Sequence, residues 1–318
     1  MAVCICGDSA RHLIEGMEPK DLEALRPVDA SDVVLEAPTW QEARELSLNV
    51  WGERGLHADV LVLKEAHRRT SQELDYHLWR GDIPPRSLML TASGTLLTTP
   101  WFDLILCSSG LSTVELSKRI MGMTAVFRMT RTAKEGFVES KPFTTTEELS
   151  DYLTSAKGLQ GIARVREALE WSPPRARSPR EIDATLALVM PRRRNGCGLP
   201  LPELNHRVDP SIAARKMMGK EEVFVDLFWR HRDDAHIDAG VEYLGKEHHT
   251  NLGEDLTRAN ALSLEGIDLQ LMADEQLKSA GQILMIAKRV ARAIGFKPYG
   301  NKWPSEEDLQ GLIDQILK

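Results

Sequence analysis

The sequence predicts an α/β (α+β) protein with a mixed α+β domain over residues 1–160 and a second mixed domain over residues 161–318. Three observations lead to this prediction. Short apolar runs with strand-like patterns recur along the chain. Stretches with helical spacing lie between them, and several of these begin with capping signals. The glycine-containing stretch Gly158-Leu159-Gln160-Gly161 then separates the two halves.

Composition is that of an ordinary globular protein. The 318 residues are enough for two cores, with 42% hydrophobic and 27% charged residues. A formal charge of −7 argues against a protein that binds polyanions over its whole surface, although it is compatible with a local basic patch. No apolar run approaches about 20 residues, and residues 1–14 lack a cationic start, so we expect neither a membrane span nor a signal peptide. Four cysteines without paired or zinc-type spacing favour reduced thiols in a cytoplasmic protein.

Capping signals and apolar spacing define the N-terminal half. Ser112 and Thr145 each precede a glutamate by three residues, the capping-box pattern that opens a helix. Arg128, Arg131 and Lys134 form a charge run, for which solvated surface is favoured over contact with DNA. The predicted helices cover residues 20–25, 39–51, 100–106, 112–123 and 149–156, and strands are predicted at 59–63 and within 74–99.

The second half opens with a helix over residues 178–190. Ser178 suits the N-cap, Pro179 suits the first helical position, and Glu181 completes a capping box, a role that by itself accounts for this acid. Arginines flank the helix on both sides and could contact phosphates, with solvated surface as the favoured alternative. These arginines are Arg175, Arg177 and Arg180 at its start and Arg192, Arg193 and Arg194 after it.

Two strand-like runs, Val223–Trp229 and Ile237–Leu244, flank a charged turn and predict a hairpin. Side chains alternate between faces along a strand, so Asp226 is predicted on the face opposite its apolar neighbours. Those neighbours, expected to share one face, are Val223, Val225, Leu227 and Trp229.

Asp226 and Glu242 would lie on one face if this hairpin closes. Two carboxylates held there repel each other and lose hydration. A divalent cation such as Mg²⁺ would relieve both effects, because it binds through one or two carboxylates together with water and substrate phosphate. The alternative is a pair of acids on the solvated face of an antiparallel hairpin.

The remaining chain adds a helix, a strand and a second helix. Residues 254–264 form the first helix, in which Asp255 and Arg258 are placed to pair. Residues 267–271 alternate as a strand, and residues 277–294 form a long amphipathic helix. From residue 178 the predicted order is therefore helix, strand, strand, helix, strand, helix.

This order, with acids at these points, resembles the PD-(D/E)XK nuclease fold, and more closely its very-short-patch-repair-like endonuclease domains. These domains carry an acid on the first helix, a V-D strand end, an E-x-D-G-x-x-H strand and a D-x-x-R-x-x-x-L helix. The match covers residues 178–275. The corresponding residues here are Glu181, Val225-Asp226, Glu242-Tyr243-Leu244-Gly245 with His248, and Asp255, Arg258 and Leu262.

The resemblance implies a restriction-endonuclease-like mixed sheet flanked by helices, and a metal-dependent DNA endonuclease. Asp226 and Glu242 would hold Mg²⁺ or Mn²⁺, with Glu181 as a ligand or a water-bridged support. His248 or His249 would move a proton or contact the scissile phosphate. The residues implied to contact DNA are Arg180, Arg192, Arg193, Arg194, His249 and Arg258.

Leu244 departs from the pattern of these domains. It stands where the general family has lysine and this subgroup has aspartate, and leucine can neither bind a cation nor orient water. Lys246 lies two residues further on and is the candidate substitute. The alternative is therefore a catalytically inactive relative that binds nucleic acid or protein.

The whole chain also resembles actinobacterial proteins that carry such a domain behind a region similar to abortive-infection toxin–antitoxin proteins. This resemblance implies a regulatory or toxin–antitoxin role with a protein partner as a third hypothesis.

Overall fold

The computed structural model describes residues 2–52, 56–68, 71–130, 133–245, 252–298, 300 and 302–318. It confirms the mixed α/β class, because both halves combine helices with β-sheets. The chain forms two compact units, and these interleave in sequence. The first unit comprises residues 1–116, 128–138 and 144–167, and the second comprises residues 117–127, 139–143 and 168–318. The short segments 117–127 and 139–143 therefore pack with the C-terminal part of the chain.

A six-stranded sheet forms the centre of the first unit. Its strands are β1 (Cys4–Ile5), β2 (Arg26–Val28), β3 (Ala58–Val62), β4 (Leu74–Leu78), β5 (Leu88–Leu90) and β6 (Leu96–Thr98). They lie in the order β2-β5-β6-β1-β3-β4. β1 runs parallel to β6 and antiparallel to β3, so the sheet is mixed.

Several helices in this part of the chain begin with capping motifs, and those at Ser112 and Thr145 were predicted from the sequence. Thr39 and Glu42 form a complete capping box, and so do Thr145 and Glu148. Ser112 and Glu115 exchange the same two hydrogen bonds. The helices are α1 (Gly7–Gly16), α2 (Pro19–Glu23), α3 (Trp40–Trp51), α4 (Pro100–Cys107), α5 (Thr113–Met123), α6 (Thr146–Ser155) and α7 (Ile162–Leu169).

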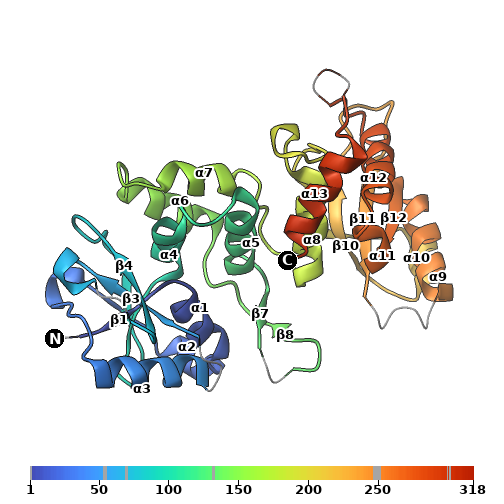
Figure 1. The fold of residues 1–318 in the computed structure, drawn as a ribbon. Coiled ribbons are helices and arrows are strands. Elements are labelled where there is room, and N and C mark those ends of the chain that lie inside the picture. The colour runs from blue at the N-terminus through green and yellow to red at the C-terminus, as the bar shows by residue number, and fades with distance from the viewer. Residues whose placement is uncertain are drawn as a thin grey trace. The chain divides into compact units, whose positions relative to one another are not determined.

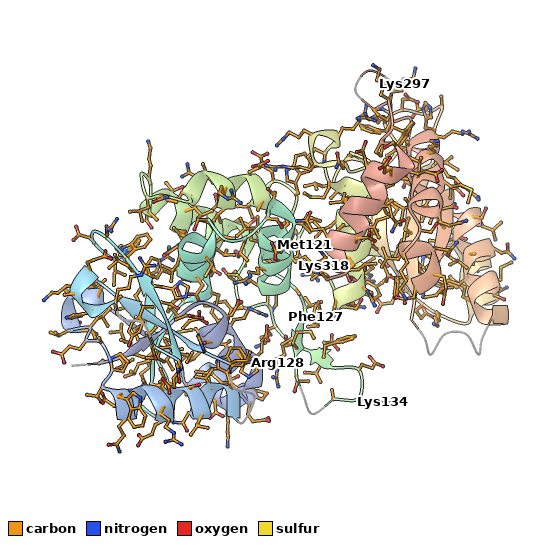
Figure 2. The ribbon with its side chains drawn as sticks, viewed as in Figure 1. Met121, Phe127, Arg128, Lys134, Lys297 and Lys318 are labelled. Atoms are coloured by element: carbon orange, nitrogen blue, oxygen red, sulfur yellow. The ribbon has the colours of Figure 1, made fainter. Side chains whose placement is uncertain are left out.

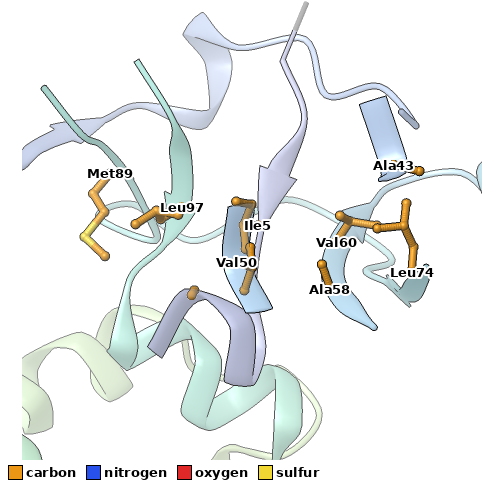
Figure 3. Packing of buried hydrophobic residues seen from close by; sticks show 9 residues of the cluster. Ile5, Ala43, Val50, Ala58, Val60, Leu74, Met89 and Leu97 are labelled. Atoms are coloured by element: carbon orange, nitrogen blue, oxygen red, sulfur yellow. The ribbon is translucent and has the colours of Figure 1, made fainter. Parts of the chain in front are cut away.

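The core of the first unit lies between this sheet and helices α1 and α3. Val50 of α3 packs in one apolar cluster with Ile5 of β1 and Val60 of β3 (Figure 3). Met89 and Leu97 extend the cluster onto β5 and β6. Burial of these side chains fixes both helices on the sheet, because removing apolar surface from water is the main driving force for packing.

Strands β7 (Phe127–Met129) and β8 (Phe137–Glu139) form a separate two-stranded sheet. Lys134 is exposed in the turn between them (Figure 2). Arg128 Nη1 donates a hydrogen bond of 3.0 Å to the carbonyl oxygen of Met17, and Arg131 lies outside the described residues. Arg128 of the charge run therefore forms a hydrogen bond within the protein.

A four-stranded sheet forms the centre of the second unit. Its strands are β9 (Glu203–Val208), β10 (Val223–Trp229), β11 (Asp238–Leu244) and β12 (Ile267–Ala273), in the order β12-β11-β10-β9. β10 is antiparallel to both neighbours, so the predicted hairpin is confirmed, and β11 is parallel to β12. β9 was not expected, and it adds a fourth strand beside β10.

The helices of the second unit are α8 (Pro179–Val189), α9 (Ile212–Met218), α10 (Leu252–Leu264), α11 (Asp274–Leu277), α12 (Ala280–Ala293) and α13 (Glu306–Ile316). α8 contacts β10, β11, α12 and α13, while α10 contacts β12 and α9 (Figure 1). α8 is buried at every position from Glu181 to Val189, more than the expected apolar stripe. A helix buried on all sides must satisfy its acids within the protein.

None of the described helices is both long enough and apolar enough to span a membrane.

Candidate functional site

Asp226 and Glu242 occupy neighbouring positions on β10 and β11. The paired residues run from Trp229 and Ala239 to Leu227 and Val241, and Asp226 and Glu242 each follow one residue beyond the last pair. Asp226 Oδ2 also accepts a hydrogen bond of 2.9 Å from the backbone nitrogen of Tyr243. The hairpin therefore brings these two acids together.

Strand β10 departs from regular alternation beside Asp226. Val225 and Phe228 belong to one core cluster, although residues three apart on a regular strand face opposite ways. His206, which pairs with Val225 across the strands, stacks on the Phe228 ring with 4.0 Å between ring centroids. Asn205 on β9 has a φ of 52°, in the left-handed region that asparagine tolerates better than most residues. The expectation of one shared face for Val223, Val225, Leu227 and Trp229 therefore fails at this local distortion.

Glu181 is held in a fixed orientation in the first turn of α8. Its side chain is buried, with the residue 6% exposed. Oε2 accepts hydrogen bonds from the Arg177 backbone nitrogen at 2.8 Å and from Asn205 Nδ2 at 2.9 Å. Ser178 caps the helix as predicted and also donates to Oε1 at 3.1 Å. A capping box requires the Glu181 carboxylate to accept a hydrogen bond from the backbone nitrogen of Ser178. The carboxylate accepts from the backbone nitrogen of Arg177 instead, so the predicted capping box is not completed.

The Glu181 carboxyl group and Asp226 interact electrostatically. Burial, followed by the negative charge of Asp226, raises the pKa of Glu181 to about 7. The hydrogen bonds from Arg177, Asn205 and Ser178 act in the opposite direction and lower this pKa. The two acids are close enough that ionising one disfavours ionising the other. A single positive charge shared between them, either a proton or a cation, would relieve this repulsion.

Glu242 is buried and paired with Arg258 of α10. Arg258 Nη2 donates to Glu242 Oε1 and also to the backbone carbonyl oxygen of Phe224. Arg258 Nε is buried and has no hydrogen-bond partner among the described residues. The expected partner, Asp255, has a side chain outside the described ones. Arg258 therefore neutralises Glu242 within the site.

A cavity of about 230 Å³ opens beside Asp226. Asn205 and Asp226 line it together with three cationic side chains, those of Arg177, Lys220 and Arg258. One water takes about 30 Å³ of liquid volume, so the cavity has room for a small anionic group with several waters. A larger cavity, of about 510 Å³, lies in the first unit beside α1 and α3 and contains none of the predicted site residues. The smaller cavity, which is lined by Asp226 and cationic side chains, is therefore the candidate functional site.

The arginines predicted to contact DNA lie in two different environments. Arg180 pairs with Asp183 at 3.2 Å and with Asp274 at 3.3 Å, so its guanidinium is used within the fold. Arg192, Arg193 and Arg194 form an exposed 3₁₀ turn after α8. The 11 residues of α8 span about 16 Å, which places these arginines at the end of the helix away from Glu181.

The loop after β11 contains three further predicted site residues. Lys246, His248 and His249 lie outside the described residues. Leu244, at the end of β11, pairs with Ala273 of β12 and is partly exposed. The lysine or aspartate position of the motif is therefore occupied by an apolar side chain at a strand end.

Two of the three predicted metal ligands form a directly interacting pair. Across the described residues, no group of three or more His, Cys, Asp or Glu side chains is placed to hold a metal ion. Glu181 and Asp226 interact with each other, whereas Glu242 is paired with Arg258. Mg²⁺ and Mn²⁺ prefer oxygen ligands, and Mg²⁺ is commonly bound by one or two carboxylates plus water. The carboxylate oxygens of Glu181 and Asp226 are of the ligand type that such a cation prefers.

The site includes residues that the sequence interpretation missed. Asn205 comes from the unexpected strand β9, and Lys220 precedes β10. The alternation of Leu204, His206 and Val208 is a strand signal that could have revealed β9. In the sequence, nothing marks Asn205 as a neighbour of Asp226, because the pairing of β9 with β10 brings it there, and nothing marks Lys220 as part of the same cavity.

The fold and the site define a mixed α/β protein in which Asp226, whose charge interacts with the buried Glu181, lines a cavity with three cationic side chains. Comparison of the chain with protein-family models, with curated proteins and with solved structures finds no match. An interpretation of function therefore rests on the residues of the site itself.

Proposed function

We propose that the second unit is a metal-dependent endonuclease that hydrolyses DNA phosphodiesters. The observation that carries this proposal is the electrostatic interaction of Glu181 with Asp226, which itself lines a cavity with cationic side chains. A carboxylate pair alone would repel a phosphodiester. With a divalent cation and neighbouring arginine and lysine side chains, the same place attracts one.

Asp226 and Glu181 would hold Mg²⁺ or Mn²⁺ in this proposal, and Glu242 would support the site from β11. When bound, the cation would lower the pKa of a water molecule and shield the negative charge of the phosphate. The metal is an expectation from the donor set and from the resemblance of the motif to PD-(D/E)XK nucleases.

The side chains of this protein would act mainly by positioning. Asn205 and the Arg177 nitrogen orient the Glu181 carboxylate, and Arg258 holds Glu242 in place. His248 or His249 would transfer a proton or contact the scissile phosphate, and Lys246 is the candidate for the missing lysine of the motif. With DNA as substrate and no disulfide among the four cysteines, the proposal places the protein in the cytoplasm.

A plasmid-nicking assay with Mg²⁺ and Mn²⁺ tests this proposal. Wild type should convert supercoiled to open circular DNA. The rate of this conversion should be at least about 100-fold lower for Asp226→Ala, because a cation ligand is removed. Asp268→Asn is the matched control, since Asp268 lies on β12 of the same sheet and pairs with Arg289 at 2.8 Å. Equal nicking by wild type and Asp226→Ala, or none by either, would end the catalytic claim.

A catalytically inactive nuclease-fold module that binds nucleic acid or a protein partner is the second candidate function. The specific observations that favour it are Leu244 at the lysine position and the pairing of Glu242 with Arg258. Calorimetry without Mg²⁺ uptake, together with salt-sensitive DNA binding, would support this candidate over the enzyme. Failure to bind DNA at low salt would remove its nucleic-acid version and leave a protein partner.

A further inference from the structure

The cavity beside Asp226 has more cationic than acidic side chains. Arg177, Lys220 and Arg258 line it, against Glu222 and Asp226. These side chains come from separate parts of the sequence, before α8, before and within β10, and from α10. Their convergence on a single cavity favours a ligand with negative charge.

Two of these charged side chains are already paired. Arg258 is bound to Glu242, and Glu222 lies 3.2 Å from Arg207 Nε. By contrast, Arg177 and Lys220 are both exposed, and neither takes part in an ion pair found among the described residues. The cationic charge available to a ligand is therefore that of Arg177 and Lys220.

Phe224 fixes the position of Arg177. The Arg177 guanidinium carbon lies over the Phe224 ring, 4.6 Å from its centroid, a cation–π contact. The backbone carbonyl oxygen of Phe224 accepts a hydrogen bond from Arg258. Phe224 thus links two arginines at the wall of the cavity and leaves the Arg177 nitrogens available as donors. An arginine guanidinium presents paired N–H donors that match phosphate oxygens.

We propose that Arg177 and Lys220 form a phosphate clamp that binds one phosphate of a DNA strand in this cavity, with Phe224 as the positioning residue for Arg177. The clamp offsets the repulsion between a phosphate and Asp226, so it contributes to binding without a metal ion. The choice of DNA as ligand rests on the proposed function, whereas the clamp itself rests on the cavity and its cations.

Salt-dependent DNA binding in EDTA tests the clamp without any contribution from catalysis. The logarithm of the binding constant for duplex DNA falls with log salt by about 0.9 per phosphate neutralised. Fluorescence anisotropy between about 50 and 200 mM salt should show that Arg177→Met and Lys220→Met each lower the slope, and that the double variant lowers it by up to about twice as much. Lys216→Met, on exposed α9 and outside the cavity, carries the same charge change and should leave the slope as in wild type.

Phe224→Leu separates positioning from charge. It should weaken binding by less than Arg177→Met and should have little further effect in the Arg177→Met background, because its contribution acts through Arg177. A fully independent effect of Phe224→Leu would overturn its positioning role. Thermal unfolding of each variant confirms that the fold is retained.

The clamp and the nuclease fail in different ways. Equal slopes for Lys220→Met, Arg177→Met, Lys216→Met and wild type would overturn the clamp, even if wild type nicks DNA. Lowered slopes for the cavity variants alone would support the clamp, even if wild type proves catalytically inactive. A wild type that binds no DNA at about 50 mM salt would overturn the clamp and the DNA substrate together.

Discussion

Arg258 pairs with the carboxylate of Glu242, whose side chain is only 8% exposed. This pair joins α10 to β11 at the edge of the site. Arg258 also gives this buried carboxyl group a partner, and burial of a carboxylate without one is strongly unfavourable. Within the site, the positive charge of Arg258 is therefore offset by Glu242.

Removing Arg258 should destabilise the protein through Glu242. Arg258→Met is expected to lower the free energy of unfolding by about 3 kcal/mol, the low end for breaking a buried pair, since the arginine is 30% exposed. Adding Glu242→Gln should restore part of this loss, because no uncompensated charge remains. Chemical unfolding of the two single variants and the double variant measures the coupling, and strictly additive losses would contradict it.

Asn205 should contribute to stability through the hydrogen bonds of its side chain and through its tolerance of a left-handed backbone. Asn205→Gly removes the hydrogen bonds to the Arg175 carbonyl oxygen and to Glu181, at an expected cost of about 1–3 kcal/mol. Asn205→Ala removes the same bonds but must also adopt the left-handed φ of 52°, so we expect it to be less stable than the glycine variant by up to about 1 kcal/mol. Urea unfolding compares the two, and an alanine variant more stable than the glycine variant would argue against the strained backbone.

The raised pKa of Glu181 should appear in the pH dependence of stability. The folded pKa is about 7 and the ordinary value is 4.5. Between these pH values the folded protein retains a proton that the unfolded chain has lost, so stability falls as pH rises through this window. Glu181→Gln removes this contribution, and the stability advantage of wild type over the variant should shrink from pH 4.5 to 7. Unfolding curves measured in EDTA provide the test, and a constant difference across the window would refute the assignment.

Gly240 should tolerate no side chain. A Cβ atom there would lie 2.8 Å from Val225 Cγ1 and 2.8 Å from Leu269 Cδ1, inside van der Waals distance. Gly240→Ala is therefore expected to lower the free energy of unfolding by about 1–3 kcal/mol through overpacking. Gly311→Ala on α13 is the control, because a Cβ meets no atom within 4 Å there and alanine favours helix. Similar stability changes in the two variants would contradict the close approach at β11.

Local signals predicted much of the fold. The capping-box patterns at Ser112 and Thr145 and the capping serine Ser178 predicted helix starts correctly, since these motifs act within one turn. The hairpin was also predictable, because a charged turn separates two runs with strong strand patterns. Asp226 and Glu242 stood out as acids within apolar strand patterns, whereas Glu181 was identified by its place in the capping pattern and by the resemblance to the nuclease motif.

The rest of the site depends on long-range pairing. β9 carries one strong apolar pair, Leu204 and Val208, which is a weak signal in a single sequence. The distortion at Asp226 depends on how β9 and β10 pair, and the preference of Arg258 for Glu242 depends on how α10 packs. Such features follow from tertiary packing, which local patterns do not encode.

The central claim is that Glu181 and Asp226 share one divalent cation. Isothermal titration with Mn²⁺ measures this most directly, on the full chain without DNA. Wild type and the control Asp268→Asn should each bind one ion, while Asp226→Asn and Glu181→Gln should each lose at least about tenfold in affinity, since each removes one anionic ligand. Wild type that takes up no Mn²⁺, or Asp226→Asn that binds as tightly as wild type, would contradict it.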